Sequence, residues 1–96
     1  MRYKNDQTLG EVIQEFIEAF RMTDKLNEVS IKANWEKTTG KVIAKHTRKI
    51  YILRRTLYLQ VDSAALREEL LMARTRLLDA LNKEFSRPVI DDIVFK

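Results

Sequence analysis

The spacing of apolar residues changes in the middle of this 96-residue chain, and the change limits the folds that it can adopt. Between residues 48 and 61, apolar side chains recur at every second position, which is the period of a half-buried β-strand. On both sides of this segment they recur every three or four residues, which is the period of an amphipathic helix. Strands that lie between helices predict an α+β fold, with helices packed on a small sheet.

The period-2 segment predicts a β-hairpin with strands over residues 48–53 and 56–61. Because side chains alternate between the two faces of a strand, each face can be assigned from the sequence. The side chains expected to face the core are Ile50, Ile52, Leu57, Leu59 and Val61. Those expected to face away are Lys49, Tyr51, Leu53, Tyr58 and Gln60. The turn residues Arg54 and Arg55 leave the turn type open, because a two-residue hairpin turn favours Asn-Gly.

Two helices are predicted before the hairpin. The first begins with a capping box formed by Thr8 and Glu11. Its apolar stripe consists of Leu9, Val12, Ile13, Phe16, Ile17 and Phe20. The second begins after residues 23–25 and contains Trp35, which we expect to pack in the core with its indole N–H bonded to a carbonyl. Gly40 either ends this helix or kinks it, because the helical pattern continues to His46.

One long helix and a final strand are predicted after the hairpin. Ser63 is a good N-cap. The stripe behind it consists of Leu66, Leu70, Ala73, Leu77 and Leu81. Pro88 ends the helical pattern, and residues 89–95 predict a final strand. Asp91 and Asp92 either interrupt this strand or balance the charge of nearby arginines. The predicted order is α-α-β-β-α-β with a three-stranded sheet, and residues 1–96 are expected to form a single domain.

Positive charge is concentrated between residues 37 and 61, which contain seven Lys and Arg and no Asp or Glu, although the whole chain has a formal charge of only +4. Cations beside aromatic rings bind phosphates and unstacked bases. The predicted nucleic-acid-binding residues are therefore Lys41, Lys45, His46, Arg48, Lys49, Tyr51, Arg54, Arg55 and Tyr58. The alternative is a solvated face that keeps the protein soluble, which composition alone slightly favours. Tyr51 and Tyr58 also form a plausible cross-strand pair without any ligand.

Several function classes are not supported. The chain contains no cysteine and one histidine, so thiolate metal sites and cysteine nucleophiles are excluded, and no Ser-His-Asp set can be assembled. Asp91 and Asp92 are adjacent and would point to opposite faces of a strand. No phosphate-binding glycine motif occurs. We therefore expect no enzyme activity, no cofactor and no metal. The N-terminus lacks a signal-peptide pattern and no apolar run is long enough to span a membrane, which predicts a cytoplasmic protein without a membrane partner.

Four segments resemble the DciA-like bacterial proteins. Residues 35–47, with Trp35, Gly40 and His46-Thr47, resemble the family's W…G…IA.HT segment. Residues 56–63 are similar to its G-x-L-x-V-x-V-x-S strand, residues 67–70 and 77–82 to the helix that follows, and residues 89–96 to its closing V..I.F+ strand.

The resemblance implies a KH-like fold and a role at the bacterial replication fork, where such proteins bind DNA, bind the DnaB-type replicative helicase and assist its loading. Two differences qualify it. Residues 38–41 contain only one glycine of the KH GXXG clamp. The sequence ends at Lys96, whereas better-known members carry a long disordered tail implicated in helicase engagement, so the resemblance supports nucleic-acid binding more than helicase loading.

Three functions follow from these observations. The first is a non-enzymatic adaptor that binds single-stranded or duplex DNA through the basic hairpin and a protein through another face, with the acidic side of the first helix as one docking candidate. The second is a KH-like RNA-binding module. The third is a protein–protein interaction domain without nucleic-acid binding.

Overall fold

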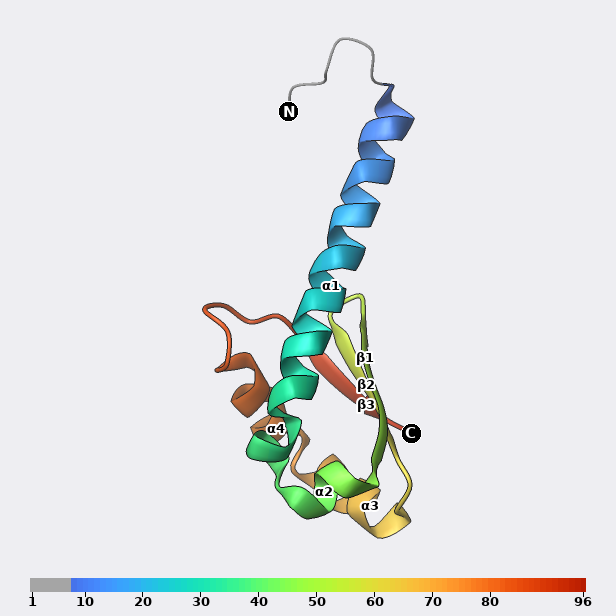
Figure 1. The fold of residues 1–96 in the computed structure, drawn as a ribbon. Helices are drawn as coiled ribbons and strands as arrows, with labels where there is room; N and C mark the ends of the chain where they lie inside the picture. Colours follow the sequence, from blue (N-terminus) through green and yellow to red (C-terminus); the bar gives the residue numbers. More distant parts are fainter. Residues whose placement is uncertain (1–7) are drawn as a thin grey trace.

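The computed structural model describes residues 8–96 and shows an α+β fold with four helices and a three-stranded mixed sheet (Figure 1). The elements, in chain order, are α1 (Leu9–Thr39), α2 (Lys41–His46), β1 (Thr47–Leu53), β2 (Thr56–Val61), α3 (Ala64–Met72), α4 (Arg74–Asn82) and β3 (Asp92–Phe95). The predicted α+β class is confirmed, but the described residues contain one more helix after the hairpin than the predicted order α-α-β-β-α-β.

Helix α1 is continuous where the sequence predicted two helices. The predicted break at residues 23–25 is wrong because this segment contains neither Pro nor Gly. The Thr23 hydroxyl donates to the carbonyl of Ala19 one turn earlier, so it bonds within the helix instead of capping a new one. The Thr8 hydroxyl accepts from the Glu11 N–H, as expected of the N-cap. Gly40 ends α1 with φ 93°, and α2 begins immediately after it, so Gly40 is a stop between two helices.

The hairpin is confirmed. Strand β2 has the predicted bounds, and β1 begins one residue earlier than predicted. The two strands pair in antiparallel fashion, and β2 pairs with β3 in parallel, so the sheet order is β1-β2-β3. Arg54 and Arg55 both have positive φ, at 50° and 63°, as a two-residue turn of the primed type requires.

The segment after the hairpin differs from the prediction in two places. The expected long helix is divided at Ala73 into α3 and α4, although Ser63 caps α3 as predicted by accepting from the Leu66 N–H. Strand β3 contains only the second half of the predicted final strand. Its first half, Val89 and Ile90, is held instead by Asn82, whose side chain bonds both backbone N–H groups and the Ile90 carbonyl.

The core lies between the helices and one face of the sheet. Its sheet side contains the predicted Ile52, Leu57, Leu59 and Val61, with Ile50 packed against it. Its helical side includes Ile31 and Trp35 of α1 and Leu70, Leu77 and Leu81 of α3 and α4. Because side chains alternate between the two faces of a strand, the opposite face of the sheet carries Lys49, Tyr51, Tyr58 and Gln60.

Candidate nucleic-acid interface

Two tyrosine rings stack on the outward face of the sheet. Tyr51 of β1 lies directly opposite Tyr58 of β2, and Tyr58 pairs in turn with Val94 of β3. The ring centroids are 5.0 Å apart and the ring planes differ by 6°. Each ring therefore gives one face to the other, and both side chains are half-buried, with Val94 of β3 next to Tyr58 on its other side. The expected outward orientation of both tyrosines is confirmed by this geometry, and the stacking also stabilises the hairpin.

Lys96 is part of this surface, although the sequence did not single it out. Its Nζ lies 5.2 Å from the Tyr58 ring centroid and 5.7 Å from that of Tyr51, and it donates to the Tyr51 hydroxyl at 3.0 Å. The hydrogen bond to Tyr51 raises the pKa of Lys96, which keeps its ammonium group protonated to higher pH. The available signal was the period of the last strand, because Val94 and Lys96 share one face.

Lys49 adds a second cation to the outward face. It pairs across the strands with Gln60, two residues along each strand from the tyrosine pair. The backbone of Lys96 bonds Leu59 and Val61 from the other side of β2, so Lys96 lies beside Gln60 as well. A row formed by Lys49, Gln60 and Lys96 therefore crosses the sheet next to the stacked rings. We call Tyr51, Tyr58, Lys49 and Lys96 the tyrosine platform.

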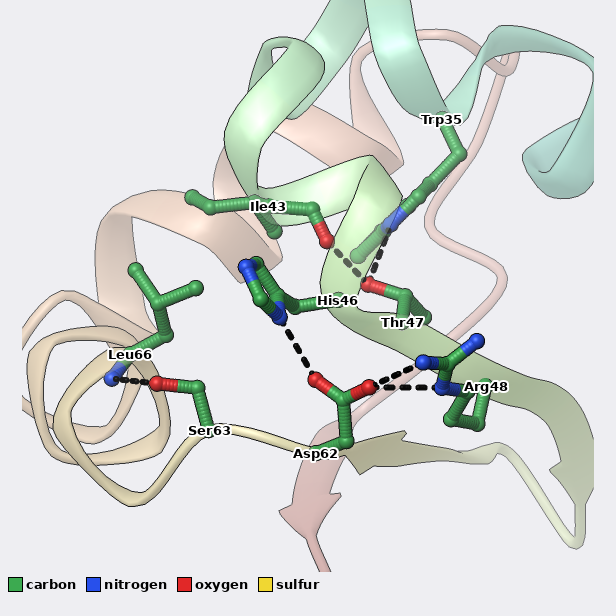
Figure 2. Close-up of polar contacts among 8 residues, drawn as sticks. All are labelled: Trp35, Ile43, His46, Thr47, Arg48, Asp62, Ser63 and Leu66. Atoms are coloured by element: carbon green, nitrogen blue, oxygen red, sulfur yellow. Dashed lines mark hydrogen bonds and ion pairs between the residues drawn. The ribbon is translucent and has the colours of Figure 1, made fainter.

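Asp62 holds two of the predicted nucleic-acid-binding residues at the base of the hairpin (Figure 2). Its carboxylate contacts His46 Nδ1 at 2.6 Å and Arg48 Nε at 2.6 Å. The strand register shifts at Arg48, and an unpaired residue of this kind redirects its side chain. Hydrogen bonds from His46 and then from Arg48 hold the pKa of Asp62 below its ordinary value. The charge of Arg48 is thus partly balanced within the chain.

A second hydrogen-bonded chain fixes the junction between α2 and β1. The indole N–H of Trp35 donates to the Thr47 hydroxyl at 3.0 Å, and that hydroxyl donates to the Ile43 carbonyl at 2.7 Å (Figure 2). Trp35 is buried, as predicted, but its partner is a hydroxyl instead of a carbonyl. This junction positions α2, whose exposed Lys41 and Lys45 are one helical turn apart and lie on one side.

Arg54 and Arg55 lie at the other end of the hairpin. Strand β1 has seven residues, so it extends for about 23 Å. Arg55 binds both carboxylate oxygens of Asp91 at 2.9 Å and the Pro88 carbonyl at 3.3 Å. This confirms that Asp91 offsets an arginine, and Asp92 does the same for Arg74. The nine predicted residues therefore form two groups, one at the platform and base of the hairpin and one at its turn.

The four predicted cations without a carboxylate partner in residues 8–96 are Lys41, Lys45, Lys49 and Arg54. Three of them belong to the base of the hairpin or the platform. In the same part of the chain, no three His, Asp or Glu side chains are grouped so that they could hold a metal ion. None of the described helices is long and apolar enough to cross a membrane.

A comparison with curated proteins gives no significant match. A comparison with protein families does: the family described as Dna[CI] antecedent, DciA matches residues 8–95. The match includes α1, the hairpin, the platform residues Tyr51 and Tyr58, and all of β3. The chain therefore belongs to the DciA family.

Proposed function

We propose that this protein is a non-enzymatic adaptor of DNA replication that binds nucleic acid through the tyrosine platform and the lysines at the base of the hairpin. The observation that carries the proposal is the stacked Tyr51–Tyr58 pair, flanked by Lys49 and Lys96 on a sheet face that the core does not use. Membership of the DciA family supports a role in loading the DnaB-type helicase. We further propose a single KH-like domain and a cytoplasmic location.

The platform suits single-stranded nucleic acid. The solvent-exposed parts of the half-buried Tyr51 and Tyr58 rings offer contact surface to unstacked bases, which duplex DNA does not present. Lys49, and Lys41 and Lys45 of α2, supply charge for the phosphate backbone beside those bases. His46 and Arg48 contribute less in this arrangement, because Asp62 competes with phosphate for both of them. Their proposed role is to keep α2 and β1 in place.

The grip differs from that of a KH domain with a GXXG clamp. Gly40 is the only glycine in residues 38–41, and its positive φ ends α1 instead of forming a loop that follows phosphates. Binding that relies on stacking and lysines reads the sequence of the nucleic acid weakly. An RNA-binding module is the second candidate, because the same platform would accept the bases of either nucleic acid. A purely structural domain would show no binding to either.

The test is a titration of the protein with single-stranded DNA, duplex DNA and RNA at several salt concentrations. Replacing Lys45 and Lys49 with Ala should weaken binding to all sequences alike. For single strands it should make the dependence of log affinity on log salt shallower by up to about 1.4, since each phosphate contact contributes about 0.7. The matched control is Arg76→Ala with Lys83→Ala, which removes two exposed cations of α4 and its C-terminal end. An equal loss of affinity in the control would show that the effect comes from the net charge of the protein and not from contacts at these two positions.

Tyr58→Ala separates stacking from charge. It should weaken single-strand binding by about 1–3 kcal/mol, while duplex binding changes less. Because the ring pair also supports the hairpin, we expect the free energy of unfolding to fall by about 0.5–1.5 kcal/mol, which leaves the fold intact. If Tyr58→Ala binds single strands as tightly as the unmodified protein, the ring pair is only a packing feature.

A further inference from the structure

Helix α1 passes the hairpin turn and then extends beyond the rest of the molecule (Figure 1). Residues of α1 and of the turn line a groove at this place. The groove has a volume of about 690 Å³, with apolar walls formed by Ile17, Phe20 and Leu53. A second hollow of about 310 Å³ adjoins it, shares Phe20 and extends to Arg87. We call this combined feature the turn groove. Its residue Leu53 lies two residues along β1 from Tyr51 and four residues, about 13 Å, from Lys49.

The apolar walls are open to solvent. The exposed fractions are 39% for Ile17, 71% for Phe20 and 55% for Leu53. These residues come from two elements that are distant in the sequence and meet at one place. A contiguous apolar patch on a charged surface is typical of an interaction site, whereas single exposed apolar residues are common.

The rim of the groove is positively charged. Arg21 and Arg54 line one part of it and Arg87 the other, and none of the three has a carboxylate partner within residues 8–96. Arg55 also lines the groove, but Asp91 balances its charge. Asp24 is the only acidic residue that lines these two hollows. An occupant with carboxylates beside an apolar surface would therefore be complementary to the groove.

The turn keeps a strained arginine at this rim. Arg54 has φ 50°, a conformation that costs a non-glycine residue about 1–3 kcal/mol and that Asn or Gly adopts more easily. Arg55 also has positive φ, but its side chain bonds Asp91 and the Pro88 carbonyl, so it has a structural role that offsets the strain. Arg54 has no comparable bond in the described chain. Strain of this kind is typical of functional positions.

We propose that the turn groove binds an amphipathic helix of a protein partner, with an apolar stripe that packs on Phe20 and Leu53 and carboxylates that pair with Arg21, Arg54 and Arg87. A helix that lies in an apolar groove is a common mode of peptide recognition. The proposal moves Arg54 from the nucleic-acid interface to a protein interface at the hairpin turn, whereas Lys41 and Lys45 lie at the opposite end of the hairpin.

Three other occupants fit the groove less well. The α1 helix of a second copy would bring its apolar stripe, but Glu11 and Glu18 lie about 160–180° around the helix from Phe20 and would not reach the arginines. A membrane-surface helix carries Lys and Arg on its polar side, whereas the polar side of residues 8–20 carries only carboxylates as charged groups. Nucleic acid would meet two aliphatic walls and a single aromatic ring.

The probes are two labelled 18-residue helical peptides with the same leucine stripe, one flanked by Glu and the other by Lys. Fluorescence anisotropy with the full chain should show binding of the Glu peptide at micromolar concentration and at least about tenfold weaker binding of the Lys peptide. Equal binding of the two peptides, or no binding of the Glu peptide at several hundred micromolar, would overturn the proposal.

Two variants locate the peptide on the protein. Phe20→Asp and Arg54→Glu should each weaken binding of the Glu peptide by about tenfold or more, because one removes an apolar anchor and the other reverses a rim charge. The matched controls are Leu71→Asp and Arg76→Glu, which make the same changes at exposed positions of α3 and α4 and should leave binding unchanged. The unfolding midpoint of each variant shows that it is folded, which the exposure of Phe20 predicts.

Two further results would assign the groove to another occupant and thereby contradict the proposal. Sedimentation equilibrium that shows a dimer of this chain, lost in Phe20→Asp, would mean that a second copy covers the groove. Displacement of the Glu peptide by single-stranded DNA, together with weaker DNA binding by Phe20→Asp, would mean that nucleic acid occupies it. We expect a monomer, and DNA and peptide bound at the same time.

Discussion

The two halves of α1 both carry apolar residues on one side of the helix, but the environments of these residues differ, although Val12 of the N-terminal half is also buried. In the C-terminal half, Ile31 is fully buried and Trp35 is nearly so. In the N-terminal half, Ile13, Phe16 and Phe20 occupy the same side of the helix and remain exposed. Period-3.6 spacing therefore identified the apolar side of the helix, but it did not show whether anything covers that side.

The difference follows from the lengths of the elements. At 1.5 Å per residue, the 31 residues of α1 extend for about 46 Å. The seven residues of β1, at about 3.3 Å each, extend for about 23 Å and cover roughly half of that length. The uncovered half begins at the hairpin turn, where the turn groove lies.

The largest expected effect is a matched pair of substitutions in the two halves. Ile31→Ala should lower the free energy of unfolding by about 2–5 kcal/mol, because it leaves a cavity in the core. Ile13→Ala, at a side chain that is 49% exposed, should change it by about 0.5 kcal/mol or less. Denaturant unfolding followed by circular dichroism measures both. Similar losses in the two variants would show that the N-terminal half is covered in solution.

A smaller effect is expected at Glu28, which joins the buried half of α1 to the edge of the sheet. Its buried carboxylate accepts the Ile52 N–H at 3.0 Å and contacts Lys25 and Lys32. Glu28→Ala leaves that N–H without its acceptor and should cost about 1–3 kcal/mol. Glu68→Ala, at an exposed position of α3, is the control for helix propensity. Hydrogen exchange at Ile52 would report the loss directly, and unchanged protection there would contradict this role.

The turn beside the exposed half should respond in the opposite direction. Arg54→Asn should raise the free energy of unfolding by up to about 1 kcal/mol, because Asn adopts positive φ at lower cost. The same variant should bind the Glu peptide more weakly, so stability and binding would change in opposite senses. Thermal unfolding and the anisotropy titration test the two parts. A stability loss would mean that Arg54 makes bonds that support the fold.

The smallest expected effect is a pH dependence of stability that Glu28 contributes in the buried half of α1. Burial raises the pKa of Glu28, but the hydrogen bond from Ile52 and the ammonium groups of Lys25 and Lys32 outweigh it and hold the pKa below the ordinary 4.5. Since the folded pKa is the lower one, Glu28 stabilises the fold above pH 4.5, and this contribution is lost as the pH falls through the folded value.

Glu28→Gln should therefore lose less stability than the unmodified protein between neutral pH and the acid range. Unfolding midpoints at several pH values measure this difference, with Glu68→Gln as the control. The variant will keep some acid sensitivity, because Asp62 and Asp91 also have lowered pKa values through His46 and Arg55. Identical pH profiles for Glu28→Gln and the unmodified protein would show that Glu28 does not carry this contribution.

Features that depend on neighbours in the sequence were predictable. The hairpin, its inward and outward side chains and the caps at Thr8 and Ser63 follow from local periodicity and local hydrogen bonds. Local pattern failed where two outcomes differ little in local free energy. Examples are the continuity of α1 through Thr23 and the division between α3 and α4 at Ala73.

By itself, the sequence determined which residues carry charge and which sides of the helices and strands are apolar, because period and composition are local properties. The tertiary structure decided which cations are free, since Asp62 and Asp91 come from distant segments to balance Arg48 and Arg55. It also placed Lys96 beside Tyr51 and Tyr58, because sheet order brings β3 next to β2. Whether the apolar side of α1 is buried or exposed depends on how much of the helix the sheet covers. Only the assembled fold determines which part of α1 lies on the sheet.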